Sequence, residues 1–223
     1  MNPKPTRPAL LGFSLDRLLI FSDAIFAFAI TLLAIDIRIT LPTTDLNNAI
    51  YNLLPRFISF ILTFWIVANY WINYHRLFRL IKNYDRTLLY LTFLFLMFIV
   101  LLPFPNDLIG KFPLTSAATI TYSAFLAFTS ISMLLLWTYV SHGHRLIDPT
   151  VRPTFIRNLT IRLTLPVLLF LLSIPLAILA PIYAIITWIL YFPIGAYIDY
   201  HYMHNQNPYP TTPPTKAIEG EKK

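Results

Sequence analysis

One carboxylate, Asp23, interrupts the first long apolar run of the chain, which continues from Ala24 to Ile35 without a charge. A charged side chain inside a membrane-spanning helix costs roughly 2.5–3.5 kcal/mol on insertion scales, so it marks a functional site or a paired structural one. Such a carboxylate can relay protons or bind a cation, or it can anchor its helix through hydrogen bonds. We favour the anchor, because a helical wheel turns Asp23 toward small residues.

The face of the first helix that carries Asp23 also carries Ala27, Ile30 and Ala34. Small residues let helices approach closely in lipid, so we expect this face to pack against a neighbouring helix. Asp23 then needs hydrogen-bond donors, and Ser22 beside it can complete a network. The candidate donors are Arg17, Trp71, Asn73, His75 and Arg76.

The nearly opposite face of the same helix carries Phe28, Thr31, Leu32 and Ile35. Periodicity alone favours plain contact with lipid or another helix, because most apolar stripes are packing surfaces. The sharper interpretation is a pore lining, in which apolar rings gate ion flow by dewetting.

Other chemistry finds little support in the chain. The spacing of His142 and His144, and of His201 and His204, fits a metal site only loosely, and no acidic or cysteine partner clusters with either pair. The absence of cysteine excludes disulfides and thiol nucleophiles, and no G-x-S-x-G or H-E-x-x-H motif appears. We therefore predict no metal, no cofactor and no enzymatic activity.

The elements that must position these residues are membrane spans. Hydrophobic residues make up 57% of the chain and charged residues 12%, with a mean hydropathy of +0.62, which predicts an all-α integral membrane protein. Six stretches are each close to the ~20 residues that a helix needs to cross the hydrocarbon core. These predicted spans are residues 18–40, 53–75, 87–106, 116–140, 159–180 and 181–200, with a tight turn near Pro181 between the last two.

Lys and Arg concentrate before span one, between spans two and three, between spans four and five, and in the tail. The positive-inside rule then places both termini in the cytoplasm, and the net charge of +7 indicates topology rather than nucleic-acid binding. We expect a cytoplasmic arm over 1–17, a six-helix transmembrane domain over 18–204 and a disordered tail over 205–223. The arginines expected to fix topology and touch lipid headgroups are Arg145, Arg152, Arg157 and Arg162.

The segment from Arg17 to Asp23 matches R-x-x-x-F-S-D, the signature of the transmembrane-protein-175 family of potassium channels. Residues 70–78, at the end of span two, and residues 101–105, at the end of span three, also resemble that family. A chain with one six-span unit is similar to the prokaryotic members. The resemblance implies a homotetramer in the plasma or inner membrane, with K⁺ as the permeant ion and the first helices around a central pore.

In that family an apolar residue five positions after the motif Asp forms the constriction, and a Thr three positions later contributes to selectivity. Those positions are Phe28 and Thr31 here, and Leu32 and Ile35 continue the face. The family commonly has Ile or Leu where this chain has Phe28, and often a second His where it has Tyr74. The chain has five glycines and no T-V-G-Y-G loop, so a carbonyl filter of that kind is excluded.

The main hypothesis is therefore a leak-like, potassium-selective channel with a hydrophobic gate. The alternative is a proton-coupled secondary transporter that uses Asp23. Transporters often show inverted repeats and interrupted helices in corresponding halves, and neither feature is evident here.

Overall fold

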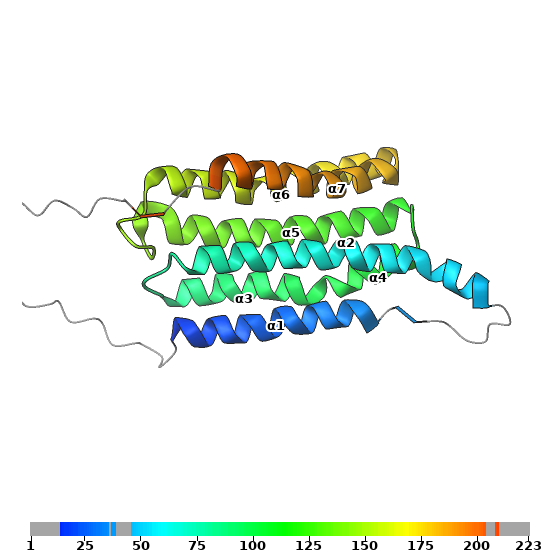
Figure 1. The fold of residues 1–223 in the computed structure, drawn as a ribbon, viewed down its shortest axis with the longest axis horizontal. Helices are drawn as coiled ribbons and strands as arrows, with labels where there is room; N and C mark the ends of the chain where they lie inside the picture. Colours follow the sequence, from blue (N-terminus) through cyan, green and yellow to red (C-terminus); the bar gives the residue numbers. More distant parts are fainter. Residues whose placement is uncertain (1–13, 36, 39–45, 204–207, 210–223) are drawn as a thin grey trace, which may run out of the picture.

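The computed structural model describes residues 14–35, 37–38, 46–203 and 208–209, and its regular elements there are helices. The long helices lie side by side in one bundle (Figure 1). They are α1 (Leu15–Ile35), α2 (Leu46–Phe78), α3 (Arg86–Leu101), α4 (Pro103–Lys111), α5 (Ser116–Ser141), α6 (Pro153–Leu179) and α7 (Pro181–Ile198). A 3₁₀ turn, η1 (His142–His144), follows α5, and a π turn, η2 (Asp199–Met203), follows α7.

With α3 and α4 counted together, six helical segments in this part of the chain are long and apolar enough to cross a membrane, so the six predicted stretches are confirmed as candidate spans. The turn between the last two is also confirmed, because Ala180 is extended and Pro181 begins α7. The predicted third span, which counts as one crossing from Arg86 to Lys111, breaks at Leu102. Pro103 begins α4 there, since a proline has no N–H to continue the first helix and is well suited to start the second.

The first span is shorter than predicted. Helix α1 ends at Ile35 instead of residue 40, close to where the sequence becomes charged at Asp36 and Arg38. Most of the predicted arm (1–17) and tail (205–223) falls on residues 1–13, 205–207 and 210–223, which lie outside the described residues. Of the described part of the arm, residues 15–17 already belong to α1; in the tail, Pro208 O accepts a hydrogen bond from Arg152 N at 3.0 Å.

Helix α1 begins, and α7 ends, toward the same end of the bundle (Figure 1). We call this the terminal end and the opposite one the distal end. Two connections meet at the terminal end: Lys82 N donates to Leu146 O at 2.9 Å, and Asp148 N donates to Leu80 O at 3.1 Å. The α2–α3 and α5–α6 connections are therefore held together by backbone hydrogen bonds.

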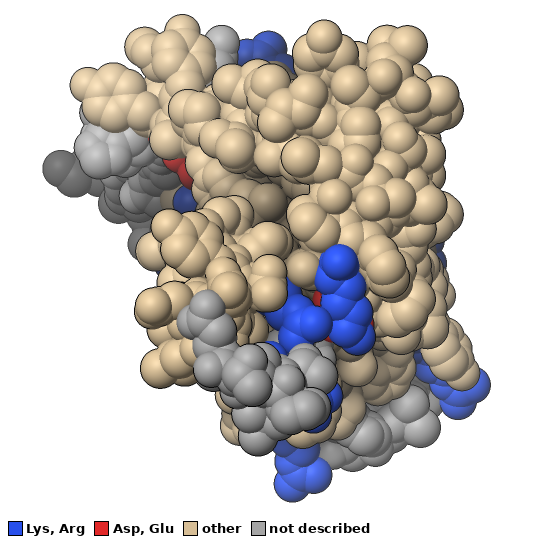
Figure 2. Space-filling view, turned by 90° about the vertical axis from the view of Figure 1, so that its right-hand side faces the viewer, with Lys and Arg blue, Asp and Glu red and all other residues tan. Residues whose placement is uncertain are grey.

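The distal end has a mostly uncharged surface with a few basic side chains near one another (Figure 2). The basic residues on its elements include Arg38, Arg56 and Lys111, of which Lys111 pairs with Asp107 one turn earlier in α4. Gly110 lets α4 approach α2 closely, because a Cβ at Gly110 would lie 2.9 Å from Arg56 Cγ.

Aromatic rings hold α1 against α2 and α3 in the core. Phe26 of α1 lies 5.8 Å from Tyr74 of α2 and 6.0 Å from Phe95 of α3, measured between ring centroids. Tyr74 and Phe95 are themselves stacked at 5.7 Å. Such pairs contribute about 0.5–1.5 kcal/mol beyond the burial of their area, so this cluster defines which side of α1 faces the bundle.

Candidate functional site

Helix α1 lies at the edge of the bundle (Figure 1). The side chains that it buries fully form one ridge. The buried residues of that ridge are Leu18, Ser22, Phe26, Ala29 and Leu33. Ala27 and Ala34, which were predicted to pack, are exposed. The predicted packing face of α1 was therefore wrong within one chain: the buried face is rotated from it by one residue, about 100° about the helix axis. The reason is that the large Phe26 side chain packs into the aromatic cluster.

The face of α1 turned away from the bundle presents large apolar side chains. Phe28 is 59% exposed and Ile35 57%, Thr31 is also exposed, and Leu32 is half-buried. One row of exposed positions recurs at alternating intervals of four and three residues, the spacing by which helices contact one another along one seam; Ile20, Ala27 and Ala34 beside this row are exposed as well. We call this row the α1 stripe; it comprises Arg17, Phe21, Ala24, Phe28, Thr31 and Ile35.

Thr31 is the one hydroxyl residue on the α1 stripe. Its Oγ1 donates to Phe28 O at 2.8 Å, so the hydroxyl hydrogen is used within the helix. The lone pairs of Oγ1 remain able to accept a hydrogen bond or face a cation. The stripe thus offers one oxygen per chain between apolar side chains.

Asp23 binds two side chains of α2. Trp71 Nε1 donates to Asp23 Oδ1 at 2.9 Å, and His75 Nε2 lies 3.1 Å from the same oxygen. Trp71 and His75 are one helical turn apart, with ring centroids 4.4 Å from each other. The Asp23 side chain is 45% exposed, so the contact anchors α1 at its surface and does not bury a charge deeply.

The other predicted partners of Asp23 lie elsewhere. Asn73 Nδ2 donates to Asn69 O at 2.9 Å, and Arg76 Nη1 lies 3.0 Å from Asp199 Oδ1. Arg17 is exposed on the α1 stripe. Of the candidate donors, the structure brings only Trp71 and His75 to the carboxylate among the described residues.

Ser22 forms a separate and fully buried contact. Its Oγ lies 2.7 Å from Leu18 O, to which it donates, and 2.7 Å from Tyr74 Oη. Because the single hydroxyl hydrogen of Ser22 goes to Leu18, the Tyr74 hydroxyl must donate to Ser22. Ser22 and Asp23 therefore tie α1 to neighbouring side chains within the same two turns of α2.

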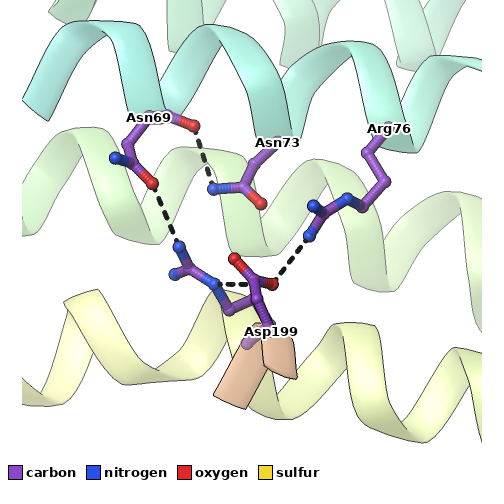
Figure 3. Close-up of polar contacts among 5 residues, drawn as sticks. Asn69, Asn73, Arg76 and Asp199 are labelled. Carbon is purple, nitrogen blue, oxygen red and sulfur yellow. Dashed lines mark hydrogen bonds and ion pairs between the residues drawn. The ribbon is translucent and has the colours of Figure 1, made fainter. Parts of the chain in front are cut away.

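A second polar cluster, missed from the sequence, lies among α2, α6 and the end of α7 (Figure 3). Arg162 of α6, only 2% exposed, donates from Nη2 to Asn69 Oδ1 at 3.1 Å and from Nε to Asp199 Oδ1 at 3.3 Å. Arg76 reaches the same Asp199 oxygen. We call Asn69, Asn73, Arg76, Arg162 and Asp199 the Arg162 cluster. The expectation that Arg162 touches lipid headgroups was wrong, because its side chain is buried within the bundle.

The Arg162 cluster holds two guanidinium groups and one carboxylate. The Arg162 guanidinium also lies 5.5 Å from the Tyr191 ring centroid, and a Cβ at Gly195 would come within 3.1 Å of Nη2. A buried charge is tolerated only when it is paired and hydrogen-bonded, so these contacts clamp α6 and α7 onto α2.

The chain is similar in sequence to known potassium channels. The family model described as "Endosomal/lysosomal potassium channel TMEM175" matches residues 17–103. A potassium channel of Streptomyces collinus is 28% identical over 165 residues, which cover 70% of this chain and 79% of that protein. A potassium channel of Chamaesiphon minutus is 30% identical over 138 residues, covering 59% of this chain and 68% of that protein.

A solved structure shares the fold. The crystal structure of a lysosomal potassium-selective channel TMEM175 homolog from Chamaesiphon minutus superimposes with a TM-score of 0.72 at 23% identity. The match covers 83% of this chain and 96% of that chain. The six-helix arrangement described above is therefore that of a known channel structure.

Proposed function

Because the chain belongs to the TMEM175 family of potassium channels, we propose that its α1 stripe lines a K⁺-selective pore at the centre of a homotetramer. The chain is a multi-pass membrane protein, and its bacterial relatives suggest the cell membrane. In the proposed assembly each subunit contributes one α1. The exposed α1 stripe carries this proposal.

The exposure of the α1 stripe supports a surface that is completed by other copies. Helix α1 uses one ridge for its own bundle and leaves the opposite face, with Phe28, Thr31 and Ile35, uncovered within the chain. A lipid-facing helix needs no hydroxyl at its centre. A helix that faces identical copies around an axis can use the Thr31 oxygen toward a permeant cation.

The rings at Phe28 and Ile35 of the α1 stripe, with the half-buried Leu32 beside them, would form the hydrophobic constriction. An apolar ring gates ions by dewetting and admits a cation only after part of its hydration shell is removed. K⁺ loses its water at a lower cost than Na⁺, so such a ring favours K⁺. Thr31 oxygens beside the constriction offset part of that cost. A ring of Phe28 side chains is bulkier than one of Ile or Leu and favours a narrow, often closed pore.

The motif residues would set the rotation of α1 about its own axis. The contacts of Asp23 with Trp71 and His75, and of Ser22 with Tyr74, approach α1 from α2 on the side away from Phe28. A rotation by one residue, about 100°, would replace Phe28 by a neighbouring alanine at the axis. In this proposal Asp23 is a positioning residue, which disfavours its use as the coupling carboxylate of a transporter.

The terminal end is proposed to face the cytoplasm. Most Lys and Arg in the short connections lie there, while the distal end has few, so the positive-inside rule gives this orientation. The proposed arm over 1–17, transmembrane domain over 18–204 and tail over 205–223 would then place both termini inside.

Substitution of Phe28 tests the constriction. We expect Phe28→Ala to widen the narrowest ring, so that single-channel K⁺ conductance rises and the K⁺/Na⁺ permeability ratio falls in planar bilayers. Phe128→Ala is the matched control, since Phe128 is 51% exposed but lies on α5. Unchanged conductance and selectivity in Phe28→Ala would exclude Phe28 from the constriction.

Cross-linking tests the assembly. The chain has no cysteine, so Ile35→Cys introduces a single thiol on the α1 stripe. We expect mild oxidation in the membrane to give covalent dimers for Ile35→Cys and none for Leu168→Cys, which is 61% exposed on α6. Equal yields for the two positions would contradict a central arrangement of α1.

A further inference from the structure

A groove of about 510 Å³ opens between the start of α3 and the end of α5, and its lining includes no residue of α1. Its walls are Leu91 and Leu135, with Thr87 and Thr138 between them and the terminal end. Thr87 belongs to the first turn of α3 and Thr138 to the last turn of α5. The groove therefore runs from an apolar level of the bundle to the level where two spans end.

The polar end of the groove holds Arg145, His142 and Tyr139. The Arg145 guanidinium lies 4.6 Å from the Tyr139 ring centroid, and its Nη2 is 3.8 Å from Asp85 Oδ2. A cation over an aromatic face is attracted by the ring, so these two contacts position the guanidinium without a tight ion pair.

Both oxygens of Asp85 are already used by other donors. Leu88 N donates to Oδ1 at 2.9 Å, and Tyr139 Oη donates to Oδ2 at 2.5 Å. At 3.8 Å the Arg145 contact is too long for a hydrogen bond. Among the described residues the Arg145 guanidinium forms no hydrogen bond, so all its N–H donors remain for a ligand.

We propose that this groove binds one anionic phospholipid, with its phosphate at Arg145 and His142 and an acyl chain along Leu91 and Leu135. A phospholipid has a charged headgroup followed by an apolar chain, and the groove has a polar end followed by apolar walls in the same sequence. The polar end of the groove is at the level of the headgroups in the leaflet at the terminal end. Arginine binds phosphate through two parallel N–H donors, and basic pockets between helix ends hold anionic headgroups. This inference needs the membrane setting but not the pore, so it stands or fails separately from the proposed constriction.

The size and charge of the groove favour a lipid over a second copy of the chain. A packed helix is about 10–12 Å across, whereas a volume of about 510 Å³ suits a headgroup and the first part of one chain. Arg145 supplies a charge that an anionic ligand complements, while the chain itself is poor in acidic residues, with 10 Asp and Glu in 223.

Native mass spectrometry measures the proposed preference. Purified protein is incubated with equal amounts of phosphatidylglycerol and phosphatidylcholine of the same acyl chains, and retained lipid is counted. We expect the native chain to retain phosphatidylglycerol at least fivefold over phosphatidylcholine, Arg145→Gln to lose that preference, and Arg145→Lys to keep part of it. Arg157→Gln, an exposed arginine near the start of α6, is the matched control and should keep the full preference. Equal preference in Arg145→Gln and the native chain would overturn the proposal.

Photo-crosslinking gives the position independently of any substitution. A phosphatidylglycerol with a diazirine in its acyl chain should label peptides of α3 and α5 that contain Leu91 and Leu135. Labelling spread evenly over the helices would contradict a defined site. Thr138→Cys supplies a unique thiol in the groove, and disulfide dimers of this variant would show a second copy there and overturn the lipid assignment.

Discussion

The buried hydrogen bond between Ser22 and Tyr74 gives a prediction with a definite asymmetry. Ser22 Oγ donates to Leu18 O and accepts from Tyr74 Oη, each at 2.7 Å, and both side chains are fully buried. Ser22→Ala leaves the Tyr74 hydroxyl buried with no partner among the described residues. Tyr74→Phe leaves Ser22 with its donor still bonded to Leu18. The first change should therefore cost more free energy of unfolding than the second.

The size of each loss in unfolding free energy depends on which buried polar group the variant leaves without a hydrogen-bond partner. A buried unsatisfied donor costs about 1–3 kcal/mol in soluble proteins, but hydrogen bonds between membrane helices average about 0.6 kcal/mol and reach about 1.7. We therefore expect about 1.5 kcal/mol for Ser22→Ala and about 0.5 kcal/mol for Tyr74→Phe. Replacing both partners by apolar groups removes the orphaned hydroxyl, so the double variant should cost about 1 kcal/mol, less than the sum of about 2.

Unfolding in mixed detergent and SDS micelles, followed by tryptophan fluorescence, measures these free energies. Thr121→Val is the control, since Thr121 is only partly buried and its hydroxyl donates within its own helix, to Ala117 O; its effect should stay within about 0.5 kcal/mol. Equal costs for Ser22→Ala and Tyr74→Phe, or a double variant that equals their sum, would refute the assigned direction of the hydrogen bond.

Three further predictions concern other parts of the chain. Asp199→Asn leaves the Arg162 guanidinium, 2% exposed, without its carboxylate; we expect a loss of about 3 kcal/mol by the same unfolding assay, and a loss below about 1 kcal/mol would show that the pair is not structural. Gly195→Ala places a Cβ 3.1 Å from Arg162 Nη2, so we expect a loss of about 1 kcal/mol, whereas a gain would show that the guanidinium moves aside freely. Hydrogen bonds from Thr150 hold the pKa of the Asp148 carboxyl below its usual range. Because the pKa is lower in the folded state, the carboxylate stabilises the folded protein at pH values above the unfolded-state pKa, and this stabilisation is lost as the pH falls through the folded-state pKa. Thr150→Val removes the hydroxyl bond but keeps the backbone one, so NMR titration should show a higher Asp148 pKa, and an unchanged pKa would contradict this cause.

The sequence predicted the spans because bilayer thickness imposes a local rule. Each crossing needs about 20 apolar residues. Pro181 indicates the turn before the last span, because a proline interrupts a continuous helix. The same local logic pointed to Asp23, since a carboxylate within an apolar run stands out without any knowledge of its partners. Leu102 was missed because Pro103 falls near the end of an apolar run, where a break changes neither its length nor its hydropathy.

The rotation of α1 and the Arg162 cluster depend on distant residues. The buried side of α1 follows Phe26, which fits a cavity made by Tyr74 and Phe95, and no wheel of α1 alone contains that cavity. Arg162 is separated from Asp199 by 37 residues and from Asn69 by 93, so no local spacing joins them. The available signal was a lone arginine within the apolar run of span five.

The reversal potential of the purified protein in a planar bilayer, with K⁺ on one side and Na⁺ on the other, tests the central claim most directly. A K⁺-selective pore lined by the α1 stripe predicts a current whose reversal potential shifts toward the K⁺ equilibrium potential, and a smaller shift for Phe28→Ala. A reversal potential near zero, or slow saturable uptake without channel current, would contradict the account.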